Sequence, residues 1–194
     1  WSAGMQMNVD FTWHWHKWSA ITCIVVGAKK KATDIFTDML MRDPKDVYAL
    51  SSLAHLKAET GDQAGAVSVY QRLVRDERAP VSAWFNLGYL QQELGHLSDA
   101  ASSFRRAIAI NPKLDQAWYG LGLVLIEQGC LVEATEALEQ NTKLQPMSPY
   151  AWYQLARVHL ERGAPDAATK IIKHLKGFEP KFAAQLERET GLTG

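Results

Sequence analysis

A period of 34 residues runs through almost the whole chain. Glycines recur at this spacing five times, at Gly27, Gly61, Gly95, Gly129 and Gly163. Alanines do the same, at Ala32, Ala66, Ala100, Ala134 and Ala168. Because glycine is about 7% of average proteins, five glycines fall in one such column by chance on the order of once in a million. The pattern predicts five copies of one structural unit, which must stack because a single copy cannot bury its apolar side alone.

Each copy has the pattern of two amphipathic helices separated by a turn. In residues 81–114 the apolar positions follow helical spacing, with Trp84, Leu87, Gly88 and Gln91 before the turn and Ala100, Phe104 and Ala107 after it. The glycine between them allows the positive φ with which many helices end. A proline column then stops the second helix. Its members are Pro44, Pro112, Pro146 and Pro180, with Arg78 as the exception.

These columns resemble the tetratricopeptide repeat, whose pattern is W-x2-L-G-x2-Y, then A-x3-F, then P. The last three copies carry the expected Trp84, Trp118 and Trp152, whereas the first copy has His16 at that position. We predict an N-terminal extension (1–12), five units and a C-terminal capping helix (183–194). The units are 13–46, 47–80, 81–114, 115–148 and 149–182. The resemblance implies an all-α solenoid, a right-handed superhelix whose first helices line a concave face.

The resemblance also implies that the concave face binds a peptide. The residues expected there are aromatic and polar, as is common at protein interfaces. They are Tyr48, His55, Phe85, Asn86, Tyr89, Gln116, Tyr119, Tyr150, Tyr153, Gln154 and Arg157. An alternative stays open, in which some of the tyrosines pack against the next repeat. Some members of the family clamp a partner's C-terminal carboxylate, but the residues flanking Asn86 do not fit such a clamp. They are Ser51, His55, Gln116 and Gly120.

A column of glutamates accompanies this face, at Glu59, Glu93, Glu127 and Glu161. Each is expected in the last turn of its helix, where the helix dipole disfavours an anion by about 0.3–1 kcal/mol. One explanation is an acidic edge of the groove that selects basic partner segments. The other is repeat inheritance, or salt bridges to neighbours such as Arg162 or Lys57.

The N-terminal unit is unusually aromatic, with Trp13, Trp15 and Trp18 followed by Ile, Cys and Val residues. Only 11 uncharged residues separate Lys17 from Lys29, and a membrane-spanning helix needs about 20. The segment is therefore expected to form the first helix of unit one, although an interfacial membrane segment is the alternative. Because a terminal unit has one neighbour, we expect this end to be covered by residues 1–12, a second copy or a larger partner.

Composition and motifs restrict the function further. The chain has 21 Lys and Arg residues and 21 Asp and Glu residues, which argues against a general binder of nucleic acid or anionic membranes. Nucleotide-binding, zinc-protease and serine-hydrolase motifs are absent from the sequence. His14 and His16 fall on different helix faces, and Cys23 and Cys130 belong to distant units. We therefore expect no cofactor, no metal site, no catalysis and no disulfide.

The sequence favours a non-catalytic adaptor that binds protein or peptide partners and supports assembly of a complex. Two alternatives stay open. One is an accessory subunit of a membrane-associated complex, docked through the N-terminal repeat, and the other is a chaperone for unassembled or secreted proteins. A homo-oligomer is compatible with either, and the expected location is the cytoplasm or the periphery of a membrane.

Overall fold

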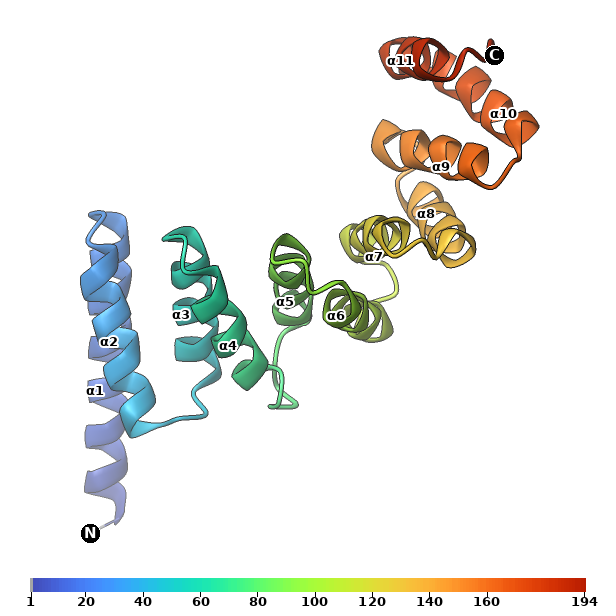
Figure 1. Ribbon diagram of the computed structural model, residues 1–194. Coiled ribbons are helices and arrows are strands. Elements are labelled where there is room, and N and C mark those ends of the chain that lie inside the picture. Colours follow the sequence, from blue (N-terminus) through green and yellow to red (C-terminus); the bar gives the residue numbers. More distant parts are fainter. Residues whose placement is uncertain (1) are drawn as a thin grey trace. The chain divides into compact units, whose positions relative to one another are not determined.

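A computed structural model describes the backbone of residues 2–194 and the side chains of residues 12–194. Within that range the chain is entirely helical, with eleven helices and no strand (Figure 1). The helices are α1 (Ser2–Val25), α2 (Lys29–Arg42), α3 (Val47–Glu59), α4 (Gln63–Leu73), α5 (Val81–Glu93), α6 (Leu97–Ile110), α7 (Asp115–Glu127), α8 (Leu131–Leu144), α9 (Pro149–Glu161), α10 (Pro165–Lys176) and α11 (Pro180–Thr190). The described chain divides into two compact parts, one ending at Leu90 and the other comprising Gln91–Gly194.

The five turn glycines end the first helix of each pair as expected. Their φ angles lie between 73° and 86°, in the left-handed region that side chains with a Cβ atom avoid. In the second pair, the Gly61 amide donates to the Ala58 carbonyl at 3.1 Å and the Asp62 amide donates to the Lys57 carbonyl at 2.9 Å. These two bonds form the Schellman motif, which satisfies the last carbonyls of the helix and reverses the chain.

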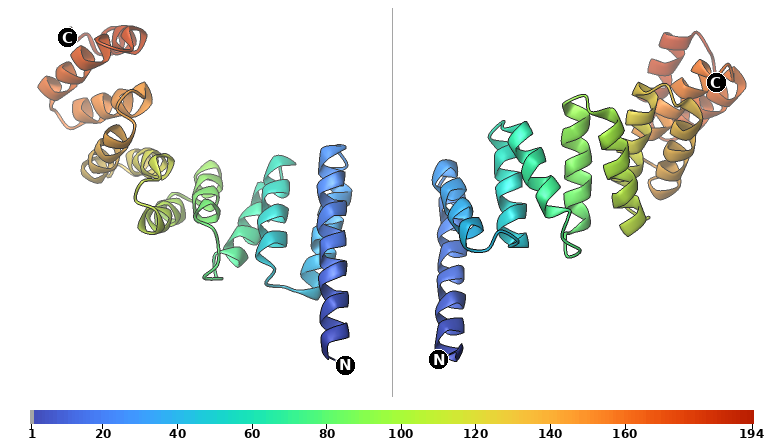
Figure 2. Two further views of the ribbon diagram at one scale, coloured as in Figure 1. Left: turned by 180° about the vertical axis from the view of Figure 1, so that it is seen from behind. Right: turned by 60° about the horizontal axis from the view of Figure 1, so that its bottom comes forward.

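In the first part, the helices pack in chain order, α1 against α2, α2 against α3 and α3 against α4. Figure 2 shows the antiparallel pairing of α1 with α2 from two further directions. The predicted alanine column lies at the contacts between helices, since Ala32 and Ala66 are fully buried. Phe36, a large residue of the same unit, is also fully buried. Small residues at the crossings therefore let the helices approach closely around large ones.

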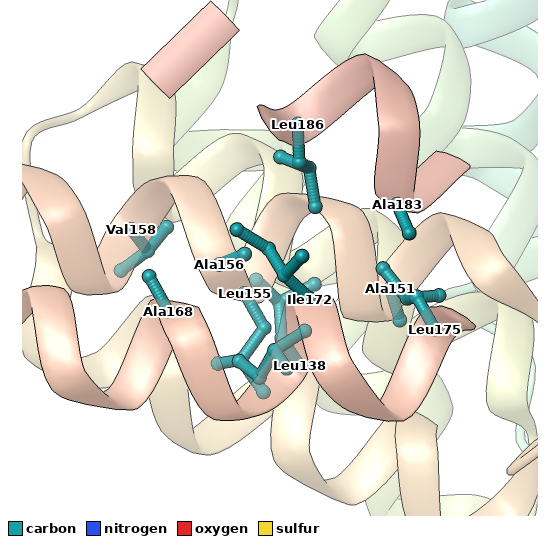
Figure 3. Packing of buried hydrophobic residues seen from close by; sticks show 11 residues of the cluster. Leu138, Ala151, Leu155, Ala156, Val158, Ala168, Ile172, Leu175, Ala183 and Leu186 are labelled. Carbon is teal, nitrogen blue, oxygen red and sulfur yellow. The ribbon is translucent and has the colours of Figure 1, made fainter. Parts of the chain in front are cut away.

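In the second part, α8 to α11 share a continuous apolar core, against which Tyr119 and Ile126 of α7 also pack. Leu138, Leu155 and Ile172 meet in this core from three successive helices (Figure 3). The C-terminal helix α11 packs against α10 and α9 and adds Leu186, which is fully buried. Helix α11 begins at Pro180, three residues before the range expected for a capping helix. It covers the apolar end of the stack, as a cap must.

The N-terminal end differs from the expected division of the chain. Helix α1 begins at Ser2 and is continuous to Val25, so residues 2–12 extend the first helix of unit one and do not fold back over it (Figure 1). Trp1 and the side chains of residues 2–11 lie outside the described residues.

Candidate functional site

A small cleft opens between the first helices of units two and three. Its volume is about 180 Å³, and its lining comes from α3, α4, the loop after α4 and α5. The lining residues are Ser51, His55, Tyr70, Pro80, Ser82, Ala83 and Asn86. The cleft therefore brings together His55 and Asn86, two of the residues expected in a peptide groove.

A hydrogen bond to a buried tyrosine orients the side chain of Asn86. Its Nδ2 atom donates a hydrogen bond of 3.1 Å to the hydroxyl of Tyr70, which is only 3% exposed. Burial raises the pKa of the Tyr70 phenol, so the hydroxyl stays protonated at neutral pH. An asparagine amide has two donor hydrogens and an acceptor oxygen, so Asn86 keeps a donor and an acceptor for a ligand at the cleft wall. Such a pair suits the backbone of an extended peptide.

Tyr70 is a site residue that the sequence analysis missed. The repeat pattern places it in an apolar column, where the other units have Phe36, Phe104, Leu138 and Ile172. The sequence could have indicated Tyr70 through its hydroxyl, which is exceptional in this apolar column. A buried tyrosine hydroxyl needs a hydrogen-bond partner.

Tyr48 has a different environment from the cleft residues. Its ring lies edge-on to Trp13 and Phe36, with centroids 6.0 and 6.1 Å apart. The Lys17 ammonium lies 4.3 Å from the centre of the same ring. Trp13 is fixed in turn by a hydrogen bond from its indole to Asp46, the N-cap of α3. Tyr48 thus joins α1, α2 and α3, an arrangement that fits the alternative of packing between repeats.

In the second part, tyrosines from α7 and α9 form a second polar and aromatic surface. Tyr119 is half-buried and is hydrogen-bonded to Gln154, and burial raises the pKa of its phenol. The Tyr153 hydroxyl donates to Glu189 at 2.6 Å and accepts from Gln185 at 3.2 Å. Both of these partners lie on α11. The helix expected only to cap the stack therefore also contributes polar groups to this surface.

Other expected groove residues lie at the surface of their helices. Tyr150 is 60% exposed and lies edge-on to Phe182, and Tyr89 is 51% exposed. Gln116 is exposed, as is Arg157, whose guanidinium lies 5.9 Å from the centre of the Tyr153 ring. Phe85 is half-buried.

The four glutamates of the repeated column are the last residues of α3, α5, α7 and α9. All four are exposed. Glu59 is 3.4 Å from Lys29 and 3.5 Å from His55, and Glu127 accepts a hydrogen bond from Gln92 at 2.8 Å.

Glu59 thus pairs with a cation of the neighbouring repeat, whereas the two cations named as examples from the sequence have other partners. Lys57 pairs with Asp62, 2.6 Å away, and so strengthens the turn of its own unit. Arg162 donates to the Thr135 hydroxyl at 2.9 Å. The partners of these two cations are therefore Asp62 and Thr135.

Three further findings concern metal ligands, membrane spans and thiols in the described residues. Among them, no group of three or more His, Cys, Asp or Glu side chains is arranged to hold a metal ion. No helix in the described range combines the length and the hydropathy needed to cross a membrane. Cys23 and Cys130 are free thiols.

Comparison with known proteins gives matches in sequence and in fold. Models of the tetratricopeptide repeat match residues 81–114 and 133–172. A crystal structure of MamA aligns with a TM-score of 0.78 at 25% identity, covering 85% of this chain and 96% of that one. MamA from Desulfovibrio magneticus RS-1 aligns with a TM-score of 0.74 at 18% identity, covering 92% and 97%.

A third solved structure is YrrB, described as a tetratricopeptide repeat protein with an unusual peptide-binding site. It aligns with a TM-score of 0.78 at 17% identity, covering 87% of this chain and 88% of that one. Comparison with curated protein sequences gives no significant match.

Proposed function

We propose that this chain, a tetratricopeptide repeat protein and thus a scaffold for protein interaction, is an adaptor that binds an extended segment of a protein partner through its first helices. The cleft between α3 and α5 is the observation that carries the proposal. It is too small for a folded partner, and its wall presents the Asn86 amide, oriented by a buried tyrosine. YrrB, with its peptide-binding site, supports the same kind of ligand.

The surface around Tyr119, Tyr150 and Tyr153 is a second proposed peptide-binding site, which lies in the second part. Tyrosine rings bury a large area and lose little conformational entropy, so they often dominate binding energy. Tyr150 offers an exposed ring at this surface, and Tyr153 is oriented by two hydrogen bonds from its hydroxyl group. A segment bound there would contact aromatic faces, whereas a segment bound at Asn86 would be held through its backbone.

The glutamate column would add a preference for basic segments. Each glutamate is the last residue of a first helix and is exposed, and Glu59 lies 3.4 Å from Lys29. Rows of like charge steer oppositely charged partners and raise the association rate more than the affinity. We therefore propose lysine- or arginine-rich segments as the preferred ligands, and supporting assembly of a complex as the role. A chaperone would instead bind unfolded segments with little dependence on sequence.

A random-peptide display selection on the intact chain tests the proposal, because it works without an identified partner. We expect it to return basic peptides with aromatic or aliphatic anchors. For a selected peptide, Asn86→Ala should weaken binding about 5- to 30-fold, which corresponds to one or two lost hydrogen bonds. Tyr119→Ala should weaken it about tenfold or more.

The matched control is Gln71→Ala, which removes an exposed amide from α4, a second helix of the same part. It should leave the affinity unchanged, and circular dichroism should show that all three variants keep their helices. Selected peptides that bind the Asn86 and Tyr119 variants as well as the unmodified chain would contradict the proposed binding face.

A further inference from the structure

The turn between α1 and α2 breaks the charge pattern of the other repeats. Where the other units have a glutamate as the last helical residue, the first unit has Val25, and three lysines follow its turn glycine at Lys29, Lys30 and Lys31. The formal charge of residues 25–31 is +3, whereas residues 59–65, 93–99, 127–133 and 161–167 have −2, −2, −2 and −1. Unit one thus reverses the sign of a surface that is acidic in every other unit.

The same turn carries an uncovered apolar surface. Val25 and Val26 are 79% and 70% exposed, and Trp15 and Trp18 on the same helix are 66% and 65% exposed. Trp15, Trp18 and Val25 are separated by three and seven residues, so they lie on one face of α1. No acidic residue occurs between positions 11 and 33, so this face carries no negative charge of its own.

Two of the three lysines after this turn are exposed and have no ion-pair partner among the described residues. Lys29 lies 3.4 Å from Glu59, which offsets its charge. Lys30 and Lys31 are exposed, and neither has an ion-pair partner among the described residues. The nearest acidic group along α2 is Asp34, about one helical turn further on. The fourth cation of the region, Lys17, is stacked on Trp13 and Tyr48 and points elsewhere.

We propose that this N-terminal face, formed by Trp15, Trp18, Val25, Val26, Lys30 and Lys31, docks the protein on a lipid bilayer that contains anionic lipids. Tryptophan favours the headgroup region of a bilayer, and lysines bind its anionic headgroups. Valines at a turn reach the boundary of the acyl chains. An acidic peptide would pair the lysines and leave the tryptophans uncovered. A symmetric second copy would bring like charges together.

The proposed membrane docking involves only the N-terminal face, so it is compatible with the zero net charge of the whole chain. A chain with zero net charge is not attracted to anionic membranes as a whole, but two unpaired lysines beside an apolar surface act within a Debye length of about 8 Å. The acidic ends of the other first helices oppose adsorption at their own positions. The membrane would therefore bind the first unit.

Cosedimentation of the intact chain with vesicles tests the proposal. The vesicles contain phosphatidylcholine alone or phosphatidylcholine with about 30 mol% phosphatidylserine, an anionic lipid, at low and at physiological salt. Binding is expected only with phosphatidylserine and should fall with salt. Lys30→Gln with Lys31→Gln should weaken it about 30-fold, from about 1 kcal/mol for each lysine near an anionic surface. Trp15→Ser with Trp18→Ser should weaken binding at every salt concentration.

The matched control neutralises two exposed lysines of α10, Lys170→Gln with Lys173→Gln. It changes the net charge equally and should leave vesicle binding intact, and circular dichroism verifies the helices of every variant. Failure of the intact chain to bind phosphatidylserine vesicles at low salt would overturn the proposal. The proposal would also be overturned if the α10 control lost as much vesicle binding as the Lys30 and Lys31 variant. Competition by soluble polyglutamate at equal charge would overturn it too, because it would indicate an acidic protein partner. A dimer in light scattering that the two tryptophan changes dissociate, without vesicle binding, would assign the face to a second copy.

Discussion

A methyl group added at Gly122 tests whether the close approach of the two helices of one repeat stabilises the fold. Gly122 lies in the middle of α7, and a Cβ atom there would be 2.8 Å from both Cγ and Cδ2 of Leu138 on α8. Leu138 is fully buried, so it has no free space into which to move. Alanine gains about 1 kcal/mol over glycine within a helix, and overpacking a core costs about 1–3 kcal/mol. We expect Gly122→Ala to destabilise the fold by about 1 kcal/mol.

The effect of Gly122→Ala on stability should change sign when the Leu138 side chain is shortened. Leu138→Ala should cost about 2–5 kcal/mol by itself. In that background Gly122→Ala should stabilise by about 1 kcal/mol, because only the helix propensity remains. Urea denaturation followed by circular dichroism gives all four free energies of the cycle. As a control, Gly177→Ala at the C-cap of α10 has φ of −71° and should shift stability by less than about 0.5 kcal/mol. A Gly122→Ala variant more stable than the unmodified chain would refute the close-packing argument.

Three further changes have defined outcomes. Ala100→Leu, at a fully buried position of α6, should cost at least about 1–3 kcal/mol and increase hydrogen exchange in the helices around it; unchanged exchange would contradict a tight crossing. Changing Glu59, Glu93, Glu127 and Glu161 to Gln should slow association with a basic peptide and flatten its salt dependence in stopped-flow measurements; equal rates and slopes for both forms would exclude an acidic edge. Glu189→Gln tests the link between α9 and α11. Hydrogen bonds from Tyr153 and Gln185 lower the pKa of Glu189 below its usual 4.5, so the ionised group stabilises the fold above that pH and this contribution is lost as the pH falls through the lowered pKa. The unmodified chain should therefore melt at a higher temperature than the variant at pH 7, and the difference should shrink below pH 4.5; a difference independent of pH would contradict this role.

Local features of the fold were predictable from sequence because they depend on single residue types at fixed positions. A glycine must occupy the left-handed C′ position, and small residues must lie where two helices cross, so both columns were visible without a structure. The start of α1 was not predictable from the repeat alignment. Between Met5 and Thr12 the sequence contains no Pro or Gly, so nothing stops the helix where the repeat pattern begins.

Contacts between neighbouring repeats account for what the sequence did not show. The hydrogen bond from Asn86 to Tyr70 depends on how α5 lies against α4. The bonds from Tyr153 to Gln185 and Glu189 depend on the rotation of α11 about its axis. Spacing within one repeat fixes the face of each helix, but it does not fix which polar atoms of two neighbouring repeats come within bonding distance.

Photo-crosslinking tests most directly that the first helices are the binding face. Benzoylphenylalanine would replace Tyr89 on α5 or Tyr150 on α9, both exposed aromatic residues of first helices. Ile110 on α6 and Val132 on α8, which are exposed residues of second helices, are the matched control positions. A peptide from the display selection should crosslink to the chain from Tyr89 and Tyr150 and not from Ile110 or Val132. Crosslinking from the second-helix positions alone would show that partners bind another face and would contradict the account.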